Sequence, residues 1–249
     1  MGIDYTRRPK ADQPPPPGGY PPPQGQPQQG YPSPQAQAQE TPPQGGGVSL
    51  SKVTLTKAAP TVSLTKHGGQ RGVMRINLNW NARPPAKGLF RKNTQLDLDL
   101  GCLYEFGDGS KGVVQALGNS FRAGPKSGAD IIVLDGDDRS GMNTNGENMS
   151  INLEDLPKIR RILVFALIYE GAANWAAAQG VLTMFPVGAP PIEVQLDDPR
   201  EGARICAVAL LTNDNGELTV RREVNYLNGA QRLLDETYGW GMNWTPGRK

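Results

Sequence analysis

The segment between positions 135 and 148 carries the residues with the clearest capacity for chemistry. Four carboxylates lie within it against one cation, Arg139, while asparagines add neutral amide oxygens and three glycines let the backbone turn its carbonyls inward. Calcium takes six to eight oxygen ligands of these kinds and tolerates irregular geometry. Because clustered carboxylates repel one another unless a cation separates them, we expect a calcium site here. Its candidate ligands are Asp135, Asp137, Asp138, Asn143, Asn145 and Glu147.

The same composition has a second interpretation. Asp, Asn and Gly are also the commonest turn residues, so the segment could be a solvent-exposed acidic turn. It is not an EF-hand, because the position that needs a bidentate Glu, counted from Asp135, is Gly146. Asp97 and Asp99 project from one side of a predicted strand, and their carboxylates could reach the same ion from the side. The alternative for this pair is the solvent-facing side of that strand.

The histidine count excludes most enzyme classes. The chain has one histidine, His67, flanked by glycines and lysine. Ser-His-Asp triads, Cys-His pairs and HExxH zinc sites all need histidine, and we expect His67 to lie in an exposed turn without such a role. Glycines 107, 109 and 112 match a dinucleotide fingerprint, but a strand pattern follows instead of a helix, which indicates a hairpin. We therefore expect a protein that is not an enzyme, with a carboxylate-based hydrolase as the weakest alternative.

The net charge and the two cysteines indicate which binding partners and which cellular compartment to expect. Lys plus Arg number 26 and Asp plus Glu 24, a net charge of +2, which is too small for a dedicated nucleic-acid or membrane-surface binder. No apolar run approaches the ~20 residues of a membrane span, and the first residues hold no apolar signal-peptide core. Two distant cysteines, Cys102 and Cys206, fit a reducing environment, so we expect a cytoplasmic protein.

The first 47 residues differ in amino-acid composition from the rest of the chain. They hold 13 of the 23 prolines, with glutamines and glycines between them and almost no aliphatic side chains. Such a segment has too little apolar surface to offset the entropy of ordering, so residues 1–47 are expected to be a disordered arm biased to polyproline II. The arm is either a solubilising tether or a ligand for a proline-recognising module. Residues 48–249 are then expected to form one large β domain.

Strand signals follow one another beyond Gly47. Residues 72–80 and 95–106 alternate apolar and polar side chains, and the continuous apolar run at 162–169 predicts a central strand covered on both faces. Residues 213–216 are typical of a two-residue hairpin turn, and 228–240 alone indicates a helix. About eleven short strands with turn chemistry between them predict an all-β fold, an antiparallel β-sandwich with a short C-terminal helix. Further strand signals lie at 49–52, 54–57, 63–66, 113–118, 129–136, 149–153, 180–185, 192–196, 203–212 and 217–227.

Several of these stretches together resemble the TerD-type domain family of bacterial tellurium-resistance and stress-response proteins. The residues that carry the resemblance are Ser-Leu-Ser-Lys at 49–52, Asn79-Trp80, Asp-Leu-Asp at 97–99, Gly-Asp-Asp-Arg-Ser-Gly at 136–141 and Tyr238-Gly239. The stretches 96–119 and 160–171 are most similar to the TerA branch. The resemblance covers roughly residues 48–244 and leaves the proline-rich arm outside.

The resemblance implies a β-sandwich that binds calcium in acidic loops, acts in the cytoplasm and supports resistance to tellurite and other stresses with partner Ter-family proteins. The implied ligands, transferred by position, are Asp97, Asp99, Asp137, Asp138 and Glu147. Where members of the family carry an acid-rich continuation, residues 142–148 of this chain carry amides, which implies a weakened calcium site. The alternative is a protein-interaction scaffold with a degenerate metal site, which recruits partners through the arm or the sandwich surface.

Overall fold

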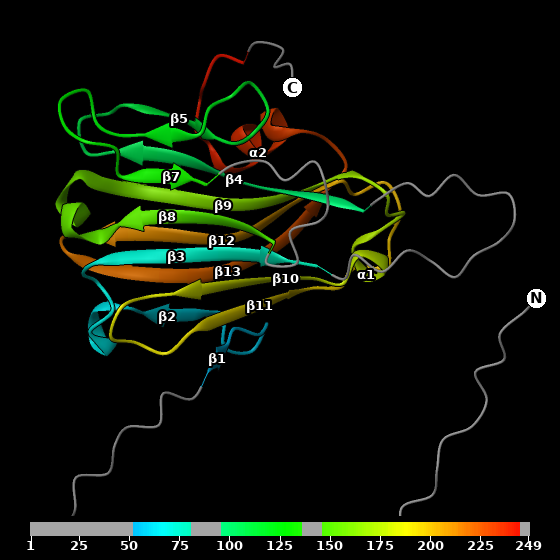
Figure 1. The fold of residues 1–249 in the computed structure, drawn as a ribbon, viewed down its shortest axis with the longest axis horizontal. Coiled ribbons are helices and arrows are strands. Elements are labelled where there is room, and N and C mark those ends of the chain that lie inside the picture. The colour runs from blue at the N-terminus through cyan, green and yellow to red at the C-terminus, as the bar shows by residue number, and fades with distance from the viewer. Residues whose placement is uncertain (1–51, 81–95, 136–145, 245–249) are drawn as a thin grey trace, which may run out of the picture. The chain divides into compact units, whose positions relative to one another are not determined.

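Two β-sheets packed face to face make up the folded part of the chain (Figure 1). The computed structural model describes residues 52–80, 96–135 and 146–244. Sheet A has the strand order β1 (Val53–Thr54), β11 (Ile192–Leu196), β10 (Gly180–Phe185), β3 (Val73–Asn79), β8 (Glu147–Asn152), β7 (Ile132–Leu134) and β6 (Arg122–Ala123). Sheet B has the order β2 (Thr61–Ser63), β13 (Glu217–Leu227), β12 (Ile205–Asp214), β9 (Ile159–Glu170), β4 (Asp97–Phe106) and β5 (Lys111–Val114). Neighbouring strands pair antiparallel except β1 and β11, which confirms the predicted fold class.

The main core fills the space between the sheets, and alternation along the strands decides which side chains enter it. On β3, Met74, Ile76 and Leu78 are fully buried, whereas Arg75 and Asn79 are exposed. On β4, Leu98 and Leu100 belong to the same core, as their spacing predicts. Period-2 strands with one face covered produce this division.

A second, smaller core lies on the outer face of sheet B. Helix α2 (Gln231–Tyr238) covers this face and buries Leu234, and Trp240, just after the helix, is buried beside it. Strand β9 therefore sends alternate side chains into two cores: Val164 into the main core and Phe165 into the second. The continuous apolar run that predicted a central, doubly covered strand has this physical cause.

The turns follow the predicted hairpins. β12 and β13 are joined at Asn215 and Gly216, both of which have positive φ, as a tight two-residue hairpin turn requires. The three glycines of the dinucleotide-like pattern lie in the connection from β4 to β5 and within β5, so a strand and not a helix follows them. The hairpin interpretation is confirmed.

Some predictions about elements are wrong. Residues 63–66 were expected to form a strand, but β2 ends at Ser63 and a short 3-10 helix, η1 (Thr65–His67), follows. Two further helices, η2 (Leu153–Lys158) and α1 (Trp175–Ala178), were not predicted. Asn152 and Asn174 cap these two helices by accepting hydrogen bonds from the backbone of Glu154 and Ala177, a signal that the sequence did contain. Among the described residues, no helix is long and apolar enough to cross a bilayer.

Candidate functional site

The predicted calcium ligands divide between two parts of the chain. Asp97 opens β4, Asp135 directly follows β7, and Glu147 opens β8. Because β7 and β8 are antiparallel neighbours, Asp135 and Glu147 flank the two ends of the predicted loop. The remaining candidates, Asp137, Asp138, Asn143 and Asn145, lie outside the described residues.

Glu147 is a buried carboxylate that connects the two sheets. Its side chain starts from β8 in sheet A, is 2% exposed, and its Oε2 accepts a hydrogen bond from the backbone N–H of Leu100 at 2.6 Å. Leu100 belongs to β4 in sheet B, in the part of that strand that precedes the residues paired with β5. A buried charge is costly unless it is hydrogen-bonded or paired, so this carboxylate needs such a partner.

Gly146 brings Glu147 into this position. The backbone at Gly146 has a φ of +70°, and a Cβ there would lie 2.1 Å from the carbonyl oxygen of Leu78. Only glycine fits, because the Cβ of any other residue would collide with the backbone of β3. A positive φ is also unfavourable for residues that have a side chain. The glycine therefore lets the chain enter β8 close against β3, with Glu147 opposite Leu78 in the register.

Asp99 is buried as well, at 4% exposure. By alternation it lies on the side of β4 opposite Leu98 and Leu100, as predicted, but this side is covered and is not a solvent-facing surface. The Glu147 carboxylate contacts the amide of the peptide group that joins Asp99 to Leu100, so it lies next to the backbone of Asp99. Asp97 is half-buried, and a register shift between Asp97 and Leu98 interrupts the alternation at that point.

Asp135 closes the base of the loop. Its N–H donates to the Asn148 carbonyl at 3.0 Å, and its carboxylate accepts from the Asn148 N–H at 3.1 Å. The Asn148 side-chain oxygen in turn accepts from Arg75 at 3.0 Å and from Asn77 at 2.9 Å. The Arg75 guanidinium lies 3.9 Å over the ring of Phe185. These residues line a polar depression of about 530 Å³ on the outer face of sheet A, which the sequence analysis missed.

The described donors suit calcium but do not by themselves form a site. Asp97, Asp99 and Glu147 offer carboxylate oxygens, which is the hard-ligand chemistry that calcium prefers. Within residues 52–80, 96–135 and 146–244, no three His, Cys, Asp or Glu side chains gather closely enough to share an ion. A complete coordination shell would therefore need ligands from residues 136–145.

His67 and several ion pairs are accounted for by the fold itself. His67 is exposed in η1, as predicted. The Arg200 side chain forms a bidentate ion pair with Asp198 in a turn, and its hydrogen bonds lower the pKa of that carboxyl. Arg160 and Arg161 both pair with Glu105, at 2.8 and 2.7 Å. None of these needs a ligand to account for it.

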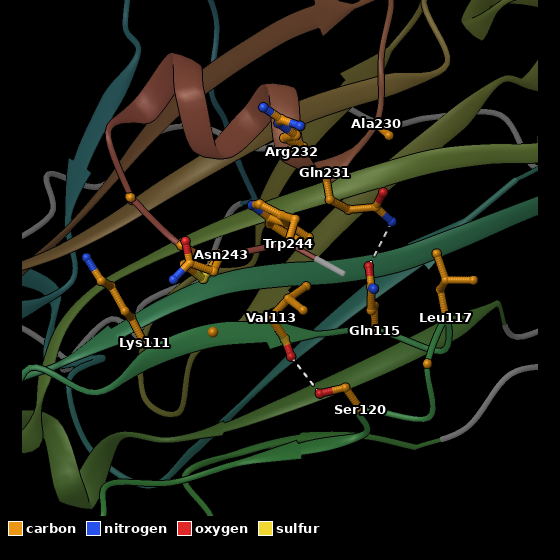
Figure 2. Close-up of a pocket in the computed structure, with 14 residues that line it drawn as sticks. Lys111, Val113, Gln115, Leu117, Ser120, Ala230, Gln231, Arg232, Asn243 and Trp244 are labelled. Atoms are coloured by element: carbon orange, nitrogen blue, oxygen red, sulfur yellow. Dashed lines mark hydrogen bonds between the residues drawn. The ribbon is translucent and has the colours of Figure 1, made fainter. Parts of the chain in front are cut away.

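A second hollow, of about 810 Å³, lies on the outer face of sheet B beside β5 (Figure 2). Its lining comes from two stretches more than a hundred residues apart, 111–120 and 230–244. The sequence analysis did not identify this hollow. No pattern in either stretch alone indicates the hollow, because it exists only where the two meet.

Comparisons with known proteins give one strong likeness. The chain is 42% identical over 206 residues to the tellurium resistance protein TerA of Alcaligenes sp, a match that covers 81% of this chain and 60% of that protein. The chain thus spans about 60% of the length of the curated relative. No known family profile matches the chain.

Two solved structures resemble the described fold, with lower sequence identity. One is a homologue of the telluride resistance protein TerD, SCO6318 of Streptomyces coelicolor A3(2), with 20% identity over 66% of this chain and 95% of that one, and a TM-score of 0.46. The other is SAV2460, a protein of unknown function, with 19% identity over 64% of this chain and 92% of that one, and a TM-score of 0.48. Both TM-scores are below 0.5, so no functional inference rests on either structure.

Proposed function

The chain belongs to the tellurium-resistance family of TerA, and from this premise we propose that it acts in resistance to tellurite and related stresses, in the cytoplasm and together with other Ter-family proteins. The two cysteines support a reducing compartment, because both are buried and form no disulfide. The activity proposed is calcium binding, without catalysis. Because the chain spans only part of its relative, the transfer of that protein's resistance role to this chain is itself a proposal.

A growth assay tests the tellurite part. A tellurite-sensitive bacterium that carries the other Ter-family genes would be grown with and without the gene for this chain. We expect the chain to raise the tellurite concentration that stops growth. Equal tolerance in the two strains, with the protein present at normal abundance, would contradict the proposed role.

The observation that carries the calcium part is the buried carboxylate of Glu147, which stands at the end of the acidic loop and contacts the backbone that follows Asp99. Burial of a carboxylate is costly without a partner, and a nearby cation favours its charged form. The residues that would hold calcium are Asp97, Asp99 and Glu147, together with Asp137 and Asp138. The ion would supply positive charge there and so strengthen the connection that Glu147 already makes between the sheets.

Calorimetry and melting curves test calcium binding directly. We expect the wild-type chain to bind calcium and to melt at a higher temperature in its presence, since binding to the native state at a hundredfold excess over Kd stabilises by about 2.7 kcal/mol. Magnesium should have a much smaller effect, because it dehydrates reluctantly and requires octahedral geometry. The Asp137→Asn, Asp138→Asn double variant should lose most of the calcium response.

The control for this experiment changes the same number of charges elsewhere. Glu201, between β11 and β12, and Asp214, at the end of β12, are exposed, so a Glu201→Gln, Asp214→Asn double variant should keep the calcium response of the wild type. No heat and no melting shift for the wild type at millimolar calcium would reject the calcium proposal. Equal responses from wild type and both double variants would place the ion elsewhere.

The second candidate function is a protein-interaction scaffold whose metal site is degenerate. Two observations favour it: residues 142–148 carry amides where the family carries acids, and a second hollow lies on sheet B, lined by none of the predicted calcium ligands. In this case tellurite tolerance would depend on the chain, yet calcium would leave the melting temperature unchanged. The growth and calorimetry experiments together separate the two functions.

A further inference from the structure

The hollow beside β5 is a groove with a strand for its floor. Figure 2 shows the side chains of Lys111, Val113 and Gln115 in a row along this strand, facing Trp244 and the start of α2. One wall is the turn that contains Leu117 and Ser120, and the other is formed by residues 230–232 and 241–244. A volume of about 810 Å³ is typical of pockets that hold ligands.

The wall formed by residues 241–244 is held in place by a buried carboxylate. Asp235 is 4% exposed and accepts hydrogen bonds from the backbone N–H groups of Gly241 and Met242, at 2.6 and 2.8 Å. It also accepts one from the indole Nε1 of Trp244 at 2.8 Å. Because these three contacts fix the segment on α2, Trp244 faces the groove without a ligand to hold it there. Pre-organisation of this kind reduces the entropy cost of binding.

Hydrogen bonds also hold the floor of the groove and its other wall in place. Gln231 donates to the side-chain oxygen of Gln115 at 2.8 Å across the groove, and the Lys111 ammonium donates to the Trp240 carbonyl. The Ser120 hydroxyl donates to the Val113 carbonyl at 2.7 Å (Figure 2). Each contact joins residues from different elements, so the groove is part of the folded framework.

The strand in the floor is also an edge. β5 is the terminal strand of sheet B and pairs on one side with β4. The Val113 carbonyl that accepts from Ser120 points away from β4, so by alternation the backbone groups of Lys111 and the N–H of Val113 face the same edge, and Ser120 already occupies the Val113 carbonyl. Within the described part of the chain, no strand pairs with this edge beyond the single bridge of Gln115 to Ser120. Exposed edges of this kind accept extended peptides.

The charges of the groove have one sign. The charged residues of its lining are Lys111 and Arg232, and no Asp or Glu is among the residues that line it. Lys111 uses one of its donors on Trp240, and Arg232 uses its Nε on Glu236, so both cations keep further donors. Val113, Leu117, Met242 and Trp244 add apolar surface between and around the cations.

We propose that this groove binds an extended acidic peptide segment of a partner protein. The peptide would lie along β5, with carboxylates toward Lys111 and Arg232 and an apolar side chain against Trp244 and Val113. A strand-like partner fits because the edge offers backbone hydrogen bonds, and an acidic one fits because the charged lining is basic. This binding site is distinct from the calcium proposal and does not depend on it.

Fluorescence anisotropy with two labelled peptides tests the proposal on the full chain. The acidic probe is Glu-Val-Glu-Leu-Glu-Val-Glu, and its charge-reversed counterpart is Lys-Val-Lys-Leu-Lys-Val-Lys. We expect the acidic peptide to bind and the basic one not to, with binding that weakens as salt rises. The Trp244→Ala variant should weaken binding about thirtyfold, the effect expected for a central aromatic anchor.

A second pair of variants separates the groove from general charge effects. Arg232→Gln should weaken acidic-peptide binding by about threefold to tenfold, as loss of a charge at the rim of an interface does. The matched control is Arg221→Gln, because Arg221 is an exposed arginine in a similar ion pair on β13, four strands away from β5 in sheet B. Circular dichroism melting of each variant shows whether the fold is retained.

Four outcomes would overturn the proposal. The first is no binding of the acidic peptide at about 1 mM, and the second is equal binding of the acidic and basic peptides. The third concerns a second copy of the chain as the occupant: sedimentation would show a wild-type dimer that dissociates in the Trp244→Ala variant. Equal loss of binding in Arg232→Gln and Arg221→Gln would also reject this groove as the site.

Discussion

At the scale of single residues, buried and turn carboxylates join separate segments of the chain. Glu147 reaches from sheet A to the Leu100 amide in sheet B, and Asp235 holds residues 241–244 on α2. Asp108 joins two turns, since it accepts from Ser110 and from the Lys126 backbone. In each case an acid accepts hydrogen bonds from N–H or O–H groups that would otherwise lack an acceptor in the fold.

Removal of the Glu147 side chain should destabilise the protein even without calcium. Glu147→Ala leaves the Leu100 N–H buried without its acceptor, which costs about 1–3 kcal/mol, while Glu147→Gln keeps an oxygen and should cost less. Urea unfolding in the presence of a chelator measures both. Glu201→Gln, at an exposed turn, should leave the midpoint unchanged. An unchanged midpoint for Glu147→Ala would mean that this bond contributes nothing.

Asp108, in the turn after β4, should make the stability of the protein depend on pH. The Ser110 hydroxyl, then the Lys126 and Ser110 backbone amides, lower the pKa of Asp108 from 3.8 to about 2. A carboxyl whose pKa falls on folding stabilises the native state above its unfolded pKa and loses that effect as pH falls through the folded value. Asp108→Asn should therefore lower the melting temperature at pH 7, and the difference from wild type should shrink between pH 4 and pH 2. A difference that stays constant over this range would contradict the assignment.

At the scale of elements, a single arginine of sheet B makes several of the contacts that hold the end of α2. Arg161 of β9 donates to Glu105 of β4 at 2.7 Å and to the carbonyls of Tyr238 and Gly239 at the end of α2, both at 3.1 Å. Its guanidinium also lies 3.8 Å from the ring of Trp240. Arginine suits this position because its planar group can bond in several directions and stack on an aromatic ring at once.

The two arginines that share Glu105 should differ sharply on substitution. Arg161→Ala removes four contacts around α2 and leaves acceptors without donors, so we expect a loss of about 2 kcal/mol and faster hydrogen exchange in α2. Arg160 is 68% exposed, and Arg160→Ala should cost less than about 1 kcal/mol, as exposed ion pairs do. Urea unfolding and amide exchange measure the two effects. Equal costs would mean that the attachment of α2 does not depend on Arg161.

At the scale of the whole molecule, composition separates residues 1–47 from the part that holds the cores. These residues contain 13 prolines and almost no aliphatic side chains, whereas both cores are made from residues between Leu55 and Trp240. Folding stability comes mostly from burial of apolar surface, so it should reside in residues 48–249.

A chain that starts at Gly47 should therefore melt at the same temperature as the full chain, because the arm has almost no apolar side chains to bury. Differential scanning calorimetry of both proteins under the same conditions provides the measurement. A melting temperature several degrees lower for the shortened chain would show that the arm packs on the domain. Tellurite tolerance of the shortened chain would show in addition whether the arm has a role in binding partners.

Local patterns in the sequence determined the fold class and several elements. Alternation along β3 and β4 identifies which side chains enter the core, because successive side chains of a strand point to opposite faces. The apolar run of β9 identifies a strand buried on both faces, and Asn215 with Gly216 identifies a hairpin. These are properties of neighbouring residues, so a single sequence contains them.

Only the tertiary structure decided which faces are covered and which distant residues meet. Alternation placed Asp99 on the side away from the main core, but burial of that side depends on which other parts of the protein cover it. The bond from Glu147 to Leu100 depends on the strand order of both sheets, and the groove beside β5 depends on residues 230–244 returning to residues 111–120. Period and turn chemistry specify local geometry, whereas strand order arises from packing the whole core at once, and for that reason these sites were beyond the sequence alone.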